Sequence, residues 1–258
     1  MRSMKRYGYD CSLNGVSLLS LSENLFIQGI EEEPNIKTDV SNKPSNKLSN
    51  YSGFCRESLT ISINFMTKDT NRSILSLLHS HICSWAKEGW LTTNMRDNQR
   101  IYAVCTSQPR RSYARDFDDM SIEFTAYDEC YWQEIIPKSV EVSGKNTTAV
   151  IKPNGTKECF LEADITNTSN EAVNEISLSA NGYTIAFSNL ALASGDTLKI
   201  YYNERHILLA TVNGVGKLSK RMRSSDDDIY LKNNMNNTVT FTADKACAVT
   251  LYARGLFE

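Results

Sequence analysis

The stretch Leu59-Thr60-Ile61-Ser62-Ile63-Asn64-Phe65 alternates apolar and polar side chains over its whole length. Successive side chains of a β-strand point to opposite faces, so one face of this segment would be apolar and buried. The same alternation recurs in residues 121–127. Both stretches predict strands of an antiparallel sheet that has one buried face.

One helix is expected directly after the first of these strands. Apolar residues recur there at helical spacing and continue as far as Trp85. Thr70 or Asn71 can cap the N-terminus of this helix, and Gly89 can close its C-terminus in a left-handed conformation.

The segment before the strand, residues 31–53, is a polar tract rich in Asn and Ser, with prolines at positions 34 and 44. Few of its side chains could anchor a hydrophobic core. We therefore expect either a long exposed loop or a hairpin that projects from the body, and segments of this kind are usually functional or flexible.

The second half of the chain has a different character, because no amphipathic helix is visible and short alternating segments recur between Asn, Gly and Ser turns. The expected strands are residues 140–142, 148–151, 160–165, 175–179, 184–187, 197–202, 207–211, 238–242 and 248–252. Regular short strands with such turns predict an antiparallel sandwich or jelly roll. We expect a domain boundary near Pro137, which gives domains 1–137 and 138–258.

The 258 residues carry 28 Lys and Arg against 30 Asp and Glu, a formal net charge of −2. A general nucleic-acid binder would carry a clear basic excess. No stretch is long and apolar enough for a transmembrane helix, and the basic start leads into Tyr7-Gly8-Tyr9-Asp10 where a signal peptide would need an apolar core. We expect a protein made in a cytoplasm that does not associate with a membrane.

No pattern in the sequence supports catalysis. The phosphate-binding, dinucleotide-binding, zinc-protease and serine-hydrolase motifs are all missing from the sequence. The seven cysteines are scattered and never form CxxC, and Asp226-Asp227-Asp228 lacks the alternate spacing of a calcium loop. The sequence therefore predicts no catalytic residue, no cofactor and no metal site, and favours a structural or binding protein.

The order of these elements resembles the distal tail protein family of long-tailed bacteriophages (siphophages). The resemblance covers nearly the whole chain and lies in an opening strand, a polar arm, one helix, an Arg-aromatic strand and repeated turns in the second half. The segments that carry it are residues 13–16, 59–65, 85–91, 100–104, 121–132, 181–182, 194–200 and 212–214. The terminal pair, residues 238–242 and 247–254, is similar to the closing hairpin of the family.

The resemblance implies a mainly β fold with two domains. The N-terminal domain would be a β-sandwich-like unit with one α-helix and a projecting arm. The C-terminal domain would be an antiparallel galectin-like or jelly-roll β-sandwich. The family implies no enzyme but a structural virion protein at the tail tip of a phage or prophage, made in the bacterial host cytoplasm.

The resemblance also implies partners. The chain would assemble with itself as a ring, usually a hexamer, that joins the tail tube protein to baseplate, tail-tip and receptor-binding proteins. DNA would only pass through the channel. The polar arm would clasp the next subunit and become ordered on assembly, since it has little core of its own. Its candidate contact residues are Asn35, Asp39, Lys43, Asn46 and Tyr51.

Two other functions compete with a structural role at the tail tip. A carbohydrate-binding module for host surface glycans would need aromatic platforms, and the candidates in the second half are Tyr183, Tyr201, Tyr202 and Tyr230. These tyrosines are equally compatible with packing on a sheet face, because aromatic residues are common in strands. An enzyme with an accessory sandwich domain lacks a candidate catalytic set.

Overall fold

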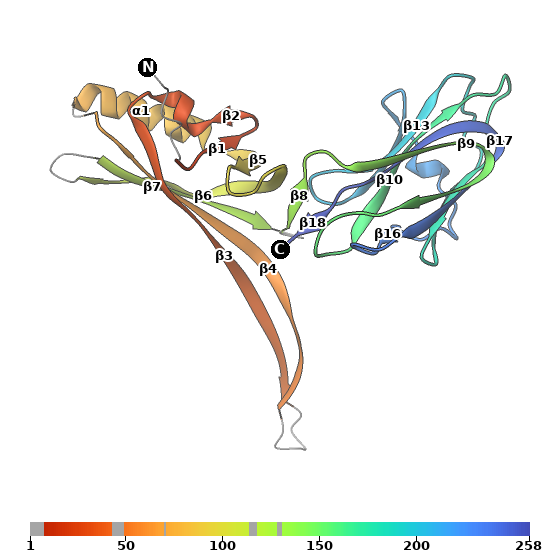
Figure 1. Cartoon of the computed structure of the whole chain (residues 1–258), viewed down its shortest axis with the longest axis horizontal. Helices are drawn as coiled ribbons and strands as arrows, with labels where there is room; N and C mark the ends of the chain where they lie inside the picture. The colour runs from red at the N-terminus through yellow and green to blue at the C-terminus, as the bar shows by residue number, and fades with distance from the viewer. Residues whose placement is uncertain (1–7, 43–48, 70, 114–117, 128–130) are drawn as a thin grey trace. The chain divides into compact units, whose positions relative to one another are not determined.

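The structure of the chain is a computed structural model that describes residues 8–42, 49–69, 71–113, 118–127 and 131–258. The chain divides into two compact units between Trp132 and Gln133 (Figure 1). The sequence placed this boundary after Pro137, so residues 133–137 belong to the second unit here.

The first unit is built on one antiparallel sheet with the strand order β2-β1-β5-β6-β7-β4-β3. Its strands are β1 (Cys11–Leu13), β2 (Val16–Ser17), β3 (Leu25–Asn42), β4 (Ser49–Thr67), β5 (Glu88–Thr93), β6 (Gln99–Tyr113) and β7 (Asp118–Tyr127), and β8 (Trp132–Glu134) follows at the boundary. The short 3-10 helix Leu18–Leu21 separates β2 from β3.

The predicted alternation produces the core of this unit. The four apolar side chains of residues 59–65 are fully buried, as are Ile122 and Phe124 of β7. The helix α1 (Arg72–Trp85) packs on this face with Leu75, Leu78 and Ile82. Asn71 caps it, since its side-chain oxygen accepts a hydrogen bond from Ser73 N at 2.9 Å, so the predicted start of the helix is confirmed.

The predicted end of this helix at Gly89 is wrong. The helix ends at Trp85 with Ala86 as its C-cap, and Gly89 lies inside β5. Gly89 serves a close approach instead, because a Cβ there would lie 2.3 Å from the side chain of Asn14. Asn14 lies in the turn between β1 and β2, and its Oδ1 accepts a hydrogen bond from Trp90 N at 2.9 Å.

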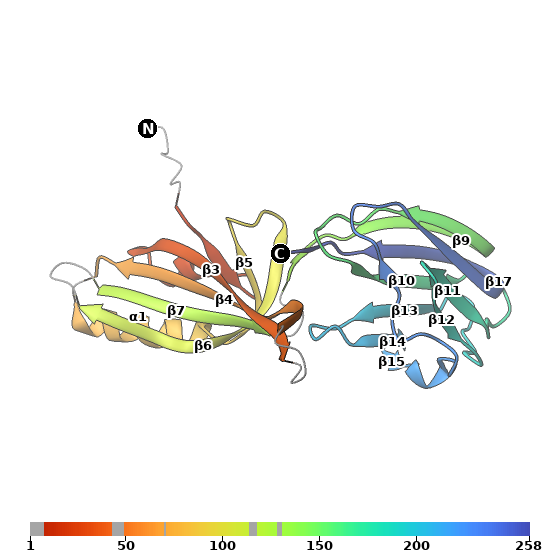
Figure 2. The same ribbon diagram turned by 90° about the horizontal axis from the view of Figure 1, so that it is seen from below.

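The polar tract forms a hairpin, the second of the two expected alternatives. β3 and β4 pair from Leu25 and Thr67 out to Asn42 and Ser49. β4 also pairs with β7, but only over Ser58–Thr67. Beyond that point the ribbon consists of β3 and β4 alone, and it projects from the sheet as an arm (Figures 1 and 2).

The second unit is an antiparallel structure with the strand order β12-β11-β17-β10-β13-β14-β15. Its strands are β9 (Lys138–Ile151), β10 (Cys159–Asn167), β11 (Ile176–Ala180), β12 (Tyr183–Phe187), β13 (Thr197–Tyr202), β14 (Leu208–Val212), β15 (Val215–Gly216), β16 (Tyr230–Leu231), β17 (Asn237–Ala253) and β18 (Leu256–Phe257), with the 3-10 helix Leu218–Lys220 after β15. β9 pairs with β17 along most of its length, and β16 pairs with β10.

The expected closing hairpin is not formed, because residues 237–253 make one continuous strand, β17. Its first half pairs with β11 and its second half with β10, and the pairing with β9 shifts register between Thr242 and Cys247. An irregularity of this kind bends a strand and raises its twist, which lets β17 belong to both halves of the sandwich.

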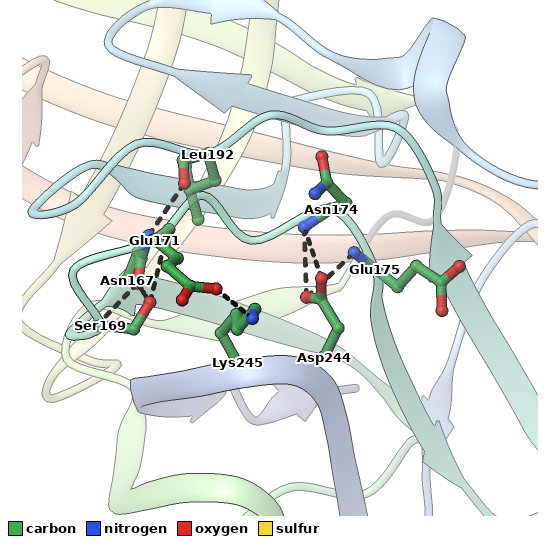
Figure 3. A network of polar contacts seen from close by, with 8 residues as sticks. All are labelled: Asn167, Ser169, Glu171, Asn174, Glu175, Leu192, Asp244 and Lys245. Carbon is green, nitrogen blue, oxygen red and sulfur yellow. Dashed lines mark hydrogen bonds and ion pairs between the residues drawn. The ribbon is translucent and has the colours of Figure 1, made fainter.

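Side chains around the irregular segment hold it in place (Figure 3). The Asp244 carboxylate accepts hydrogen bonds from Asn174 N and Glu175 N at 3.1 and 3.3 Å, and Lys245 forms an ion pair with Glu171. The buried Asn167 side chain binds the same connection, because its Nδ2 donates to Glu171 O and Leu192 O. The bend in β17 and the loop before β11 therefore form one polar network.

The prediction of a mainly β fold with one α-helix is confirmed for the described residues. In the same residues, no helix is long and apolar enough to cross a membrane.

Candidate functional site

The arm carries the first set of predicted site residues. Asn35 lies where the arm leaves the sheet, and its Nδ2 donates to Ser58 Oγ at 2.8 Å and to Thr60 Oγ1 at 3.3 Å. Asp39 lies on β3 opposite Gly53, and Tyr51 lies on β4 opposite Val40. Lys43 and Asn46 lie outside the described residues.

The outer strand of the arm, β3, lies at an edge of the sheet among the described residues. It is the last strand in the order of the sheet, and Tyr9 forms an isolated bridge to it at Ile27. The exposed Glu31 and Glu33 precede Ile36, whose side chain is 56% exposed. A strand edge of this kind can accept a further strand from another chain, while its charged side chains oppose unspecific pairing.

The base of the arm is fixed by an ion pair with an aromatic partner. Arg96 Nη2 lies 2.6 Å from Glu32 Oε2, and the guanidinium lies 5.5 Å from the centre of the Trp132 ring. The indole N–H of Trp132 donates to the same carboxylate at 3.2 Å. The sequence alone does not predict this group of Glu32, Arg96 and Trp132, because its three members are far apart in the chain.

Three of the four predicted tyrosines converge in the second unit. Tyr202 stacks on Phe160 with ring centres 4.2 Å apart, and Tyr230 lies 5.1 Å from the same ring. Tyr183 meets Tyr230 edge to face at 5.5 Å, and the His206 ring lies 5.5 Å from Phe160. Rings at these separations attract one another beyond simple burial. We call these five residues the aromatic cluster.

Tyr201 does not belong to the aromatic cluster. It neighbours Tyr202 on β13, and successive side chains of a strand point to opposite faces. Tyr201 is 36% exposed, whereas Phe160 at the centre of the cluster is only 8% exposed. Tyr183 is the most exposed tyrosine of the cluster, at 39%.

Asp228 brings a carboxylate to the aromatic cluster. It accepts a hydrogen bond from the Tyr230 hydroxyl at 3.4 Å. Burial raises the pKa of Tyr202 above its ordinary value, and the charge of Asp228 raises it further. Tyr202 is therefore a neutral phenol at physiological pH, and its hydroxyl can act as a hydrogen-bond donor.

The other two residues of the acidic run serve the loop itself. Asp226 accepts a hydrogen bond from Thr184 N at 2.6 Å, and Asp227 pairs with Arg221 at 2.8 Å. Within the described residues, no group of three or more His, Cys, Asp or Glu side chains could hold a metal ion. The run is thus a structural acidic loop with one carboxylate directed to the cluster.

A surface depression of about 350 Å³ lies beside the aromatic cluster. His206 and Asp228 line it on the side of the cluster. Ile207, Leu208 and Leu218 supply apolar lining, and the paired Arg221 and Asp227 complete it. The volume lies within the range of about 300–1,000 Å³ that is usual for small-ligand sites.

Phe160 and His206 were not identified as site residues from the sequence. Phe160 is the first residue of an expected strand, and nothing in the local pattern tells a cluster centre from ordinary core. His206 lies in the expected turn between two strands, where its φ is 55° and its N–H donates to Asn203 O at 3.0 Å.

Sequence comparison finds no matching family model and no matching curated protein. Solved structures do match. The Dit protein of phage SPP1, a hub of the adsorption apparatus of phages that infect Gram-positive bacteria, aligns with a TM-score of 0.71 and 9% identity over 95% of this chain and 98% of its own.

Two structures of the phage P2 baseplate in its activated conformation also match. The calcium form aligns with a TM-score of 0.53 and 8% identity, and the strontium form with 0.51 and 7%. Each alignment covers 96% of this chain and 97% of the other. The resemblance to the siphophage distal tail protein family is thereby confirmed in the fold.

Proposed function

We propose that this chain is a structural component of the tail tip of a long-tailed phage or prophage. The observation that carries the proposal is that the fold of an adsorption-apparatus hub protein extends over 95% of the chain, across both units. A match of one sandwich alone would be weak support, because sandwich folds serve many functions.

In this role, copies of the chain close into a ring, most simply of six. The ring joins the tail tube protein to the baseplate, tail-tip and receptor-binding proteins, and DNA passes through its channel. A net charge of −2 supports such a channel, because a strongly basic wall would retain the phosphate backbone. The chain then acts without catalysis, as part of the virion.

The arm is the proposed contact between neighbouring subunits in this ring. A two-stranded ribbon is marginally stable by itself in water, so a partner would complete it. The contacts would come from Asn35, Asp39, Lys43, Asn46 and Tyr51, and from the outer edge of β3. Contacts of this heterologous kind generate a ring when the rotation closes.

Negative-stain electron microscopy of the purified chain tests the proposal. Closed rings of uniform diameter with a central opening are the expected result. Particles with the size of a single chain at high protein concentration would contradict the proposal.

A shortened hairpin tests the arm itself. Asn35 and Ser58 are paired, so replacing residues 36–57 with Asn-Gly leaves a two-residue turn of the kind that hairpins prefer. We expect this variant to remain folded but to assemble poorly. A second variant with only residues 43–48 replaced by Asn-Gly keeps the paired strands and should retain more assembly. Rings of unchanged yield from the first variant would refute the role of the arm.

Glycan binding by the second unit is a second candidate function. It is favoured by the convergence of Tyr183, Tyr202 and Tyr230 with Asp228 beside a surface depression, since a carboxylate held by these rings can accept hydrogen bonds from sugar hydroxyls. A glycan array probed with the intact protein tests this candidate. Binding of no glycan would exclude it.

A further inference from the structure

The depression beside the aromatic cluster has two unlike walls. The first wall is apolar and comes from the turn before β14 and from the 3-10 helix at Leu218–Lys220. Ile207 is 54% exposed there and Leu218 is 38% exposed. The second wall carries His206 and Asp228. Such a surface matches a ligand that has one apolar face and one face that carries hydrogen-bonding groups.

Asp228 is the carboxylate of the acidic run that is available to a ligand. Asp226 is occupied by Thr184 N, and Asp227 by the guanidinium of Arg221. Asp228 accepts a hydrogen bond from Tyr230 at the long distance of 3.4 Å, and it also interacts with the Tyr202 hydroxyl. An ionised carboxylate has about four lone-pair sites, so Asp228 retains capacity to accept further hydroxyl donors.

The charge of the lining limits the ligand further. Of the residues that line the depression, Arg221 is the only Lys or Arg. Its guanidinium also donates to Asp227 O at 3.2 Å. Two carboxylates, Asp227 and Asp228, face this single paired cation. The site would therefore repel phosphate, sulfate and uronate groups, because like charges at short range cost free energy.

We infer that this depression binds an uncharged saccharide, with sugar hydroxyls donating to Asp228 and an apolar sugar face lying on Ile207 and Leu218. The inference rests on the second candidate function, glycan binding. It adds the place and the chemical class of the ligand, and it places the predicted tyrosines behind the site, where they hold Asp228 and His206 in position.

The intact protein is first tested on an array that holds uncharged oligosaccharides of hexoses and N-acetylhexosamines together with anionic glycans and poly(glycerol phosphate). The strongest uncharged glycan is then titrated by calorimetry against four proteins: the unaltered chain and the variants Asp228→Asn, Ile207→Ala and Tyr201→Ala. Tyr201→Ala is the matched control, because Tyr201 lies on the other face of β13 from Tyr202. Ile207 is exposed, so its truncation leaves the fold intact.

We expect binding of uncharged glycans alone, weakened at least tenfold by Asp228→Asn and clearly weakened by Ile207→Ala, with Tyr201→Ala unchanged. Binding of anionic glycans alone, or binding that neither Asp228→Asn nor Ile207→Ala weakens, would overturn the inference while leaving glycan binding in place. Binding of no glycan would remove both the inference and the second candidate function.

Discussion

Arg96 binds Glu32 through two parallel hydrogen bonds, from Nε to Oε1 at 3.1 Å and from Nη2 to Oε2 at 2.6 Å. This forked geometry is available to arginine and not to lysine. Glu32 lies at the base of the arm, and Arg96 lies in the turn between β5 and β6. Trp132 is the last residue of the first unit. The pair therefore fixes the arm to two distant parts of its own unit.

Replacing Arg96 with alanine should destabilise the first unit. The half-buried Glu32 carboxylate would keep the Trp132 donor but lose its counter-charge, at a cost of about 1–3 kcal/mol. Urea unfolding followed by far-ultraviolet circular dichroism, which reports both units, measures this change. Lys199→Ala is the control, because its ion pair with Asp164 spans 3.8 Å at an exposed site and should contribute less than about 0.5 kcal/mol. Equal effects of the two substitutions would contradict this account.

Gly155 should not tolerate a side chain. Its φ is +113°, and a Cβ there would lie 2.3 Å from the carbonyl oxygen of Leu256. We expect Gly155→Ala to cost about 2–3 kcal/mol of unfolding free energy, since both backbone strain and a backbone clash arise. Gly216→Ala has nothing within 4 Å of the added methyl and should change stability by less than about 0.5 kcal/mol. Thermal unfolding of both variants provides the comparison, and similar melting temperatures would refute the argument.

Asn167→Ala should strongly destabilise the second unit. The Asn167 side chain is 1% exposed, donates to Glu171 O and Leu192 O, and accepts from Ser169 N (Figure 3). Its removal takes away three hydrogen bonds at a buried site, among them the acceptor of Ser169 N, which should cost about 2–3 kcal/mol. Asn174→Ala, an exposed substitution in the same loop, is the control. Chemical denaturation that finds both variants equally stable would show that the network carries no stability.

Alkaline pH should weaken the fold through a buried thiol. Burial raises the pKa of Cys159 from 9.0 to about 12, and the carboxylates of Glu134 and Glu162 contribute to the increase. A group whose pKa is raised on folding stabilises the native state fully below its unfolded pKa. That stability is lost as pH rises from 9.0 toward about 12.

Cys159→Ala removes this titration. Between about pH 8 and about pH 10.5, the unaltered chain should lose about 2 kcal/mol more unfolding free energy than the variant does. Denaturant unfolding at the two pH values measures the difference. Parallel pH dependence of the two proteins would contradict the assignment.

Local sequence signals predicted the elements that local physics controls. The alternation of residues 59–65 produced a buried strand face, and Asn71 capped the helix. Each of these features depends on neighbours within a few residues, so a single sequence contains the necessary information.

Features that depend on distant partners could not be predicted in the same way. The alternation of residues 238–242 and 248–252 led to the expectation of two strands. The structure has one continuous strand, β17, with an irregularity near Asp244 that depends on residues distant in the chain. Gly89 looked like a helix end, but its role depends on Asn14, which is remote in the chain. Phe160 is the centre of a cluster only because Tyr202 and Tyr230, which come from separate strands, pack against it.

The mass of the purified intact chain in solution, measured by light scattering over a range of concentrations, tests the central claim most directly. We predict one discrete species whose mass is a whole multiple of 29.1 kDa, six being the simplest case, and which persists on dilution. A mass of 29.1 kDa at every concentration, or a continuous series of growing aggregates, would contradict the claim that copies of this chain close into a ring.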